Sequence, residues 1–351
     1  MSKNSPGNCW TENHCSAILK ACLAPFNPAP TMPAFFTFPT PTVTHETKPR
    51  MALAIWKPFK TFLERETKES IMIEYNKTLT EEQIQSFRAN GFLNYGRVLT
   101  DAQLVALRQS LDRVLCGQSA ASPEAIGNIG GGAQDVVTQV VNVWEAEPAF
   151  RDHLANPVIV PLVAQLMGTD TVRVWHDQMQ LKPPRIGGPT VWHQDHPYWH
   201  VIQPADLISA WVALEDATIE NGAMSMVRRS HLWGQYDGGT IGINPDFSPA
   251  YDPAFIPEGE TVEIVPCEVS AGSVVFHHCR TWHGAPANRS EKPRPAIAVH
   301  YMPGYTRYEP AAQTHMVERH IHVAPGEVLT GEHFPTVMES GRMVEAQKTT
   351  K

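Results

Sequence analysis

The chain has 351 residues, 42% of them hydrophobic, which is enough to bury a sizeable core in one domain with extensions. Its formal net charge of −8 argues against nucleic acid or an anionic membrane surface as the main partner. No apolar run reaches the roughly 18 residues of a membrane-spanning helix, and the first residues do not resemble a signal peptide. We therefore expect a cytoplasmic protein.

Residues 1–70 differ in composition from the rest of the chain. Prolines and threonines dominate residues 24–50, so we expect a poorly ordered N-terminal extension, with at most a short helix within residues 52–75. Three of the six cysteines lie among the first 22 residues and, together with His14, fit no common zinc-finger spacing. The absence of any CxxC pair favours a reducing compartment over a disulfide framework.

Helical signals follow the extension. Thr80 is suited to be an N-cap with Gln83 three residues later, and Asn90–Gly91 ends the helix that Thr80 begins. Thr100 begins a second helix, whose leucines line one face. In all, four helices are expected, at about residues 81–90, 101–115, 148–154 and 159–167.

From Thr171 onward the sequence alternates between apolar and polar residues, which is the period of a β-strand. Further short strands are expected at residues 207–214, 223–227, 261–265, 273–278 and 296–302. Many short strands separated by turn residues indicate a sandwich or barrel. The fold class is therefore mainly β with flanking helices. We expect one domain over residues 71–340, with a mainly helical part (71–170), a β core (171–305) and a tail (341–351).

The segment VWHQDHPYWH (191–200) is the densest group of side chains that could bind a metal. On an extended backbone His193 and Asp195 project to the same side, because side chains alternate along a strand. Two histidines and one carboxylate on one face of a metal form the facial triad of non-haem Fe(II) oxygenases, which leaves positions open for a co-substrate and O2. A third ligand must then come from elsewhere in the chain.

Three histidines in HHCRTWHG (277–284) could supply the third ligand. His277 and His278 fall inside an expected strand, so one of them faces away from the interior. His283 lies just before Gly284, where the strand would end and a side chain could reach the barrel mouth. We favour His283.

Arg294 follows an expected turn at residues 288–293. A hairpin there places Arg294 on the strand beside that of His283. A guanidinium inside a barrel requires an anion, and its paired N–H groups match a carboxylate, such as the distal carboxylate of 2-oxoglutarate.

Taken together, these features resemble the phytanoyl-CoA dioxygenase family of Fe(II)/2-oxoglutarate-dependent oxygenases over about residues 80–304. The segments that carry the resemblance are FRANGFLNYGRVLT (87–100), QMQLKPPRIGGPTVWHQDHPYW (178–199), WVALEDATIENGAMSMVRRSH (211–231) and AGSVVFHHCRTWHGAPANRSEKPRPAIAVHYMP (271–303). The resemblance implies a double-stranded β-helix, a cupin-like jelly roll, with flanking helices. It places the iron triad on His193, Asp195 and His283. It places the co-substrate arginine on Arg294.

The resemblance also suggests further co-substrate contacts. In relatives, the strand before the HxD motif supplies polar contacts to 2-oxoglutarate, which here indicates Gln178 and His176. Trp211 matches an aromatic residue that packs near the co-substrate, although a role in the core fits the sequence equally well. Lys182 and Arg185 are candidates for contact with an anionic substrate.

The resemblance implies a dioxygenase that uses Fe(II), 2-oxoglutarate and O2, hydroxylates a C–H bond of a small organic molecule and releases succinate and CO2. One alternative is a cupin-like hydrolase or isomerase that uses the same ligands with zinc or manganese. A second alternative is a non-catalytic binding barrel. Arg294 argues against the first alternative, and the intact triad argues against the second.

Overall fold

The computed structural model describes residues 78–130, 132–133, 135–236, 240–244, 247–250 and 255–344. All of these fall within one structural unit of the chain. The extension predicted for residues 1–70, its cysteines and the short helix expected within residues 52–75 lie outside the described residues. Cys267 and Cys279 are buried free thiols.

The four predicted helices are all present, and they are α3 (Glu81–Asn90), α4 (Asp101–Leu115), α5 (Pro148–Leu154) and α6 (Ile159–Met167). Thr80 and Thr100 begin α3 and α4 with capping boxes, in which the threonine hydroxyl and the glutamine three residues later satisfy each other's backbone N–H groups. Gly91 ends α3 in the left-handed conformation, at φ 84°. None of the described helices is long and apolar enough to cross a membrane.

Replacing Thr100 with alanine should lower the free energy of unfolding by about 1 kcal/mol, because the N–H of Gln103 loses its acceptor at the start of α4. Urea denaturation followed by circular dichroism measures the change. Val105 is exposed in the same helix, so Val105→Ala is the control. Equal urea midpoints for Thr100→Ala and wild type would contradict the prediction.

The strands form two main antiparallel sheets and one short pair. The large sheet has nine strands in the order β1-β12-β7-β14-β4-β16-β17, with β3 beside β4 and β2 beside β3. Its strands are β1 (Phe92–Arg97), β2 (Ala125–Asn128), β3 (Thr138–Val141), β4 (Val172–Lys182), β7 (Ile208–Ala213), β12 (Ser273–His278), β14 (Arg294–Pro303), β16 (Thr336–Glu339) and β17 (Arg342–Met343).

The small sheet has six strands in the order β10-β9-β5-β13-β8-β11. Its strands are β5 (Thr190–His193), β8 (Ser225–Val227), β9 (Thr240–Ile243), β10 (Pro249–Ala250), β11 (Ile264–Pro266) and β13 (His283–Ala285). The short pair is β6 (Ile202–Gln203) with β15 (Arg307–Tyr308). Short 3-10 helices lie at η1 (Val143–Glu145), η2 (His196–Tyr198), η3 (Ser230–Leu232) and η5 (Met316–His320).

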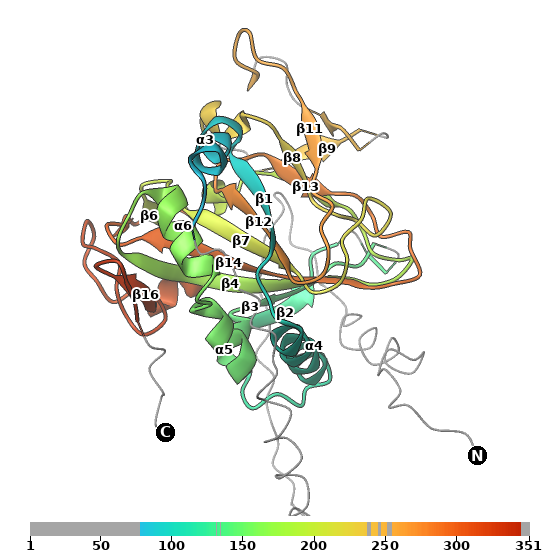
Figure 1. Cartoon of the computed structure of the whole chain (residues 1–351), viewed down its shortest axis with the longest axis horizontal. Coiled ribbons are helices and arrows are strands. Elements are labelled where there is room, and N and C mark those ends of the chain that lie inside the picture. The colour runs from blue at the N-terminus through green and yellow to red at the C-terminus, as the bar shows by residue number, and fades with distance from the viewer. Residues whose placement is uncertain are drawn as a thin grey trace, which may run out of the picture. The chain divides into compact units, whose positions relative to one another are not determined.

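From β4 to β14 the chain passes repeatedly between the two main sheets. β4, β7, β12 and β14 lie in the large sheet, whereas β5, β8, β11 and β13 lie in the small one (Figure 1). The prediction of a mainly β protein with flanking helices is confirmed. Three strands, β1 to β3, also lie in the part of the chain expected to be mainly helical, where they extend the large sheet.

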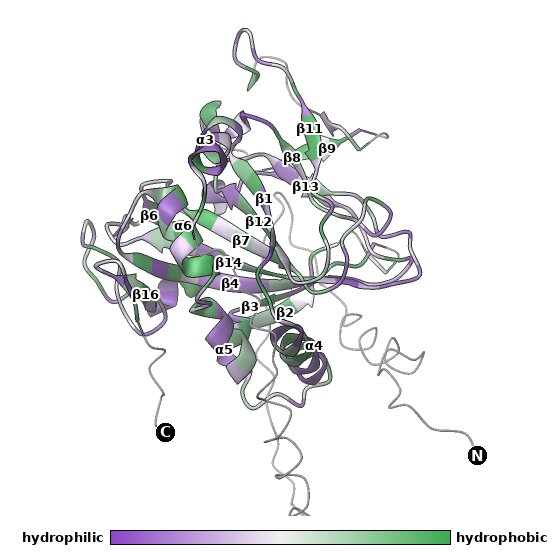
Figure 2. Ribbon diagram, in the orientation of Figure 1, coloured by the Kyte–Doolittle hydropathy of each residue, from purple (hydrophilic) through white to green (hydrophobic). Residues whose placement is uncertain are grey.

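The core lies along the large sheet, where every residue of β14 is buried. α6 packs against β7 and β14, and Figure 2 shows apolar residues concentrated in the central strands and in α6. Because every residue of β7 is buried as well, a polar side chain on β7 or β14 has no access to water. Each one therefore needs a partner or a ligand.

Candidate metal and anion site

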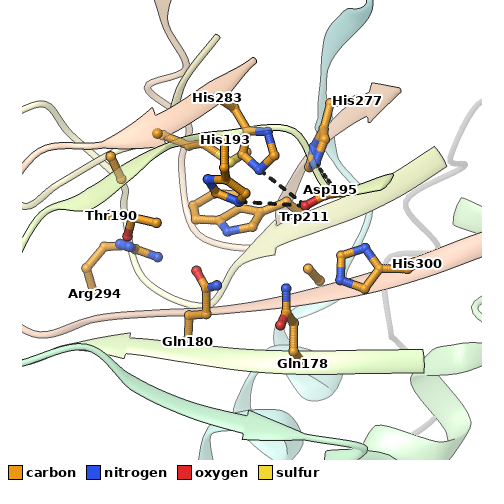
Figure 3. Close-up of a pocket in the computed structure, with 14 residues that line it drawn as sticks. Gln178, Gln180, Thr190, His193, Asp195, Trp211, His277, His283, Arg294 and His300 are labelled. Carbon is orange, nitrogen blue, oxygen red and sulfur yellow. Dashed lines mark hydrogen bonds and ion pairs between the residues drawn. The ribbon is translucent and has the colours of Figure 1, made fainter. Parts of the chain in front are cut away.

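Two histidines meet where β5 and β13 pair. His193 lies directly opposite His283 in the register of these strands, and their ring centroids are 4.1 Å apart. Ligand atoms of His193, Asp195 and His283 all lie within 4.8 Å of one another (Figure 3). Within the described ranges no other cluster of histidine, cysteine or acidic side chains has this geometry. Two imidazoles and a carboxylate are a donor set that suits Fe(II).

Asp195 reaches the two histidines by a different route from the one predicted. β5 ends at His193, and Asp195 has helical backbone angles (φ −75°, ψ −44°) as the N-cap of η2, so the expectation of an extended backbone there was wrong. The N–H groups of Asp195 and His196 both donate to the carbonyl oxygen of Cys279, at 2.9 and 3.1 Å. This link to the chain between β12 and β13 holds the carboxylate beside His283.

Backbone contacts orient both imidazoles. Nδ1 of His193 lies 2.8 Å from the carbonyl oxygen of Val191, and Nδ1 of His283 lies 2.9 Å from that of Thr281. Since a carbonyl can only accept, each Nδ1 carries the proton and each Nε2 has a free lone pair. The two Nε2 atoms lie 3.7 and 3.6 Å from Oδ1 of Asp195. Nε2 of His193, Nε2 of His283 and Oδ1 of Asp195 therefore all point toward the same position.

Burial and charge favour the metal-binding protonation states. Burial lowers the pKa of His193 and lowers that of His283 well below its ordinary value, so both imidazoles are neutral. Burial alone would raise the pKa of Asp195, but the surrounding histidines, including the hydrogen bond from His277, outweigh burial and hold the pKa well below its usual range. The site thus has one negative charge and two neutral donors.

The three histidines considered as the third ligand have distinct surroundings. His277 and His278 are adjacent on β12, and only His277 faces the site, where its Nε2 lies 3.1 Å from Oδ2 of Asp195. Nδ1 of His278 accepts the N–H of Arg280, and its ring packs near His231 on the other face of the strand. His283 alone of the three joins the cluster formed by Asp195 and His193.

The triad opens onto a pocket whose opposite wall is the large sheet. Alternate residues of β4 and β14 face it, and in the register of these strands Gln178 is opposite Ala298 and Lys182 is opposite Arg294. Arg294 and His300 lie at opposite ends of this wall (Figure 3). The pocket is lined by Gln178, Gln180, Thr190, His193, Asp195, Trp211, Met224, His277, His283, Gly284, Ala285, Arg294, Ala298 and His300.

Arg294 is a buried cation without an anion among the described residues. Its side chain is 1% exposed, and neither Nε nor Nη1 has a hydrogen-bond partner. Burial lowers the pKa of Arg294 only to about 10, so the group is charged at neutral pH. Its guanidinium lies 5.4 Å from the ring of Trp211, and Thr190, whose hydroxyl also lacks a partner, lies beside it (Figure 3). A carboxylate fits these unpaired donors.

Of the other residues predicted to contact the co-substrate or the substrate, some line the pocket and others do not. Gln178 and Trp211 line the pocket, and the side-chain oxygen of Gln178 accepts a hydrogen bond from Gln139 on β3. His176 is buried beside His300 and is not among the pocket-lining residues. Lys182 is also buried and donates to two backbone carbonyls, at 3.1 and 2.7 Å, and burial keeps its pKa well below the ordinary value.

The remaining candidate for substrate contact lies away from the pocket. Arg185 is paired with Glu291 at the surface and is not among the pocket-lining residues.

Sequence reasoning missed three residues around the triad: Ser209, Thr190 and His300. Ser209 lies two residues before Trp211, and His300 lies six after Arg294, so strand alternation puts both on the pocket side. That period of two was the available signal. Thr190 begins β5 and could be assigned only once the pairing of β5 with β13 was known.

Comparison with known proteins gives a consistent family match. Residues 87–296, more than half of the chain, match the family model described as Phytanoyl-CoA dioxygenase (PhyH). The chain is 27% identical over 243 residues to the peroxisomal phytanoyl-CoA dioxygenase of Rattus norvegicus, which covers 64% of this chain and 69% of that protein. It is 25% identical over 240 residues to the ectoine dioxygenase of Bordetella bronchiseptica, with coverage of 65% and 77%.

Solved structures agree with this match. The non-heme alpha ketoglutarate dependent carbocyclase SnoK from nogalamycin biosynthesis is 31% identical, with a TM-score of 0.62 over 75% of this chain and 98% of that one. EctD from S. alaskensis is 19% identical, with a TM-score of 0.54 over 66% of this chain and 78% of that one, and shares the fold.

Proposed function

The chain belongs to the phytanoyl-CoA dioxygenase family, and from this premise we propose that His193, Asp195 and His283 bind its Fe(II). We further propose that Arg294 binds the distal carboxylate of 2-oxoglutarate. The reaction class is that of a non-haem Fe(II)/2-oxoglutarate-dependent dioxygenase. The observation that carries the residue assignment is a buried, unpaired guanidinium facing the same pocket as two imidazoles and a carboxylate.

When bound, the iron supplies the chemistry of the family, in which O2 converts 2-oxoglutarate to succinate and CO2 and oxidises a C–H bond of the substrate. The chain's own residues bind and orient the co-substrate. The guanidinium of Arg294 and the hydroxyl of Thr190 hold one end of the co-substrate, and the ring of Trp211 shields that ion pair from water. Burial of these groups strengthens each polar contact.

Gln178 supports the same orientation. Because its carboxamide oxygen accepts a hydrogen bond from Gln139, its NH2 group is the end left to donate toward the pocket. A donor there suits the carboxylate and keto oxygens of 2-oxoglutarate. We assign His176 no direct contact with the co-substrate, since it is not among the pocket-lining residues.

We also propose that the core is a double-stranded β-helix. The alternation of β4, β5, β7, β8, β11, β12, β13 and β14 between two antiparallel sheets supports this topology. In such a fold the paired ends of β5 and β13 offer ligands at one rim, and β14 brings Arg294 against the pocket from the facing sheet.

The substrate proposed is a small organic molecule, and the reaction is hydroxylation of one of its C–H bonds. The named relatives act on or take part in the synthesis of small molecules, such as ectoine and nogalamycin. A hydrolase or isomerase would have no use for the unpaired Arg294, so we do not favour either.

An anaerobic visible spectrum tests the assignment. Addition of 2-oxoglutarate to the Fe(II)-loaded protein should produce a new charge-transfer band, which requires the co-substrate and the metal to share one site. The band should be absent without Fe(II). A well-folded, iron-loaded protein that gives no band would contradict the proposed function.

A further inference from the structure

The two oxygens of the Asp195 carboxylate have different surroundings. Oδ1 faces Nε2 of His193 and of His283, at 3.7 and 3.6 Å. Oδ2 faces the opposite way, where it lies 3.0 Å from Oγ of Ser209 and 3.1 Å from Nε2 of His277. One oxygen is therefore directed at the metal position and the other is occupied by two protein groups.

The proton on each of these partners can be assigned from the acceptors around it. A carboxylate has no proton to give, so Ser209 and His277 both donate to Oδ2. Ser209 has one hydroxyl proton, so its contact of 2.6 Å with Nδ1 of His300 must be a bond in which His300 donates. The hydrogen bonds then run in one direction, from His300 to Ser209 to Asp195, with His277 donating from the other side.

These partners form one rigid row across the large sheet. In the strand register Ser209 on β7 lies directly opposite His277 on β12 and directly opposite His300 on β14. None of the three is more than 2% exposed, so water does not compete for these hydrogen bonds. Asp195 itself lies outside both sheets, in the turn after β5. The N–H groups of Asp195 and His196 tie the backbone of that turn to Cys279, and the hydrogen bonds to Oδ2 fix the side chain of Asp195.

We propose that Ser209 and His277 are positioning residues that hold Oδ2 of Asp195, so that this carboxylate gives the metal one oxygen only. The inference rests on the proposed function, because it takes the triad as the metal site. A carboxylate that binds through one oxygen leaves three positions of an octahedral metal open beside two histidines. Without the two donors the carboxylate is no longer held toward the metal, which weakens metal binding. A carboxylate that is free to turn can also offer both oxygens, which closes a position that 2-oxoglutarate needs.

Shape-matched pairs at Ser209 separate positioning from packing. Ser209→Thr and Ser209→Val have the same shape and differ in the hydroxyl, and Ser209→Ala removes the hydroxyl without adding volume. Titration of each protein with Mn(II), followed by the electron paramagnetic resonance signal of the free ion, gives the metal Kd independently of turnover. The Val and Ala variants should bind Mn(II) about tenfold more weakly than the Thr variant and wild type.

A second pair tests His277. The amide of His277→Gln can donate from near the position of Nε2, and His277→Met has similar length without a donor. The Met variant should bind Mn(II) about tenfold more weakly than the Gln variant. With saturating Mn(II), the 2-oxoglutarate Kd should also be higher in the Val, Ala and Met variants than in their matched partners. Ser273→Ala, a buried serine on β12 away from the triad, is the control for cavity effects and should match wild type.

The outcomes distinguish this inference from the proposed function. If wild type binds Mn(II) and 2-oxoglutarate but both matched pairs show equal affinities, the positioning role is wrong and the triad assignment stands. If wild type binds neither, the proposed function fails and the positioning role fails with it. Thermal melting of each variant checks that a lost affinity is not a lost fold.

Discussion

Replacement of His283 with alanine is expected to abolish succinate formation from 2-oxoglutarate and to weaken metal binding more than any other histidine substitution on β12 or β13. His283 is 5% exposed, and its free Nε2 faces Oδ1 of Asp195 at 3.6 Å. Loss of a group that hydrogen-bonds to a metal ligand lowers the metal affinity by about 10–100-fold. Loss of one of three protein ligands should exceed that range.

His277 and His278 provide matched controls, because each is a buried or half-buried histidine in the same stretch of chain. His278→Ala should leave the Mn(II) Kd unchanged, since the His278 ring contacts Arg280 and His231 on the far face of β12. The Mn(II) Kd of His277→Ala should lie between those of His278→Ala and His283→Ala. Equal affinities for His283→Ala and His278→Ala, measured by the same titration, would show that His283 is not a ligand.

The sequence predicted the helices well because their signals are local. The caps at Thr80 and Thr100 and the stop at Gly91 lie within a few residues of the elements that they define. Strand boundaries were less accurate: the strand expected at residues 261–265 is β11 at Ile264–Pro266. Its pairing with β8, more than thirty residues earlier in the chain, sets its limits, and no local pattern encodes that pairing.

In the candidate site, too, the features that depend on local sequence were predicted and those that depend on distant contacts were not. The residue types of His193, Asp195, His283 and Arg294 were sufficient to group them in one chemical hypothesis. The predicted pairing of the strands that carry His283 and Arg294 was wrong, because β13 lies in the small sheet and β14 pairs with β4 and β7 in the large one. The conformation that unites His193 and Asp195 was not predicted, because it depends on the hydrogen bonds from the turn after β5 to Cys279. The Ser209 row could not be predicted without the register of β12, β7 and β14, because alternation gives the face on which a side chain lies but not the residue opposite it on the next strand.

Replacement of Arg294 with methionine is expected to raise the 2-oxoglutarate Kd by about 30-fold or more, since loss of one partner from a buried, hydrogen-bonded charge pair costs roughly 2–5 kcal/mol. Metal affinity should be unchanged, because Arg294 does not contact the triad. Isothermal titration with 2-oxoglutarate, in the presence of Mn(II), gives the value. Arg294→Lys should recover only part of the affinity, because a lysine cannot form the paired hydrogen bonds of a guanidinium.

Thermal stability distinguishes a binding role for Arg294 from a structural one. In the free protein Arg294 is a buried charge whose Nε and Nη1 lack partners, and it lies beside the buried amine of Lys182. Removing such a charge relieves a desolvation cost, so Arg294→Met should melt at the same temperature as wild type or higher when no ligand is present. Saturating 2-oxoglutarate should raise the Tm of Mn(II)-loaded wild type and leave that of the variant almost unchanged. A variant that melts well below wild type without ligand would instead show that Arg294 supports the fold, since a group kept only for an absent anion cannot stabilise the free protein.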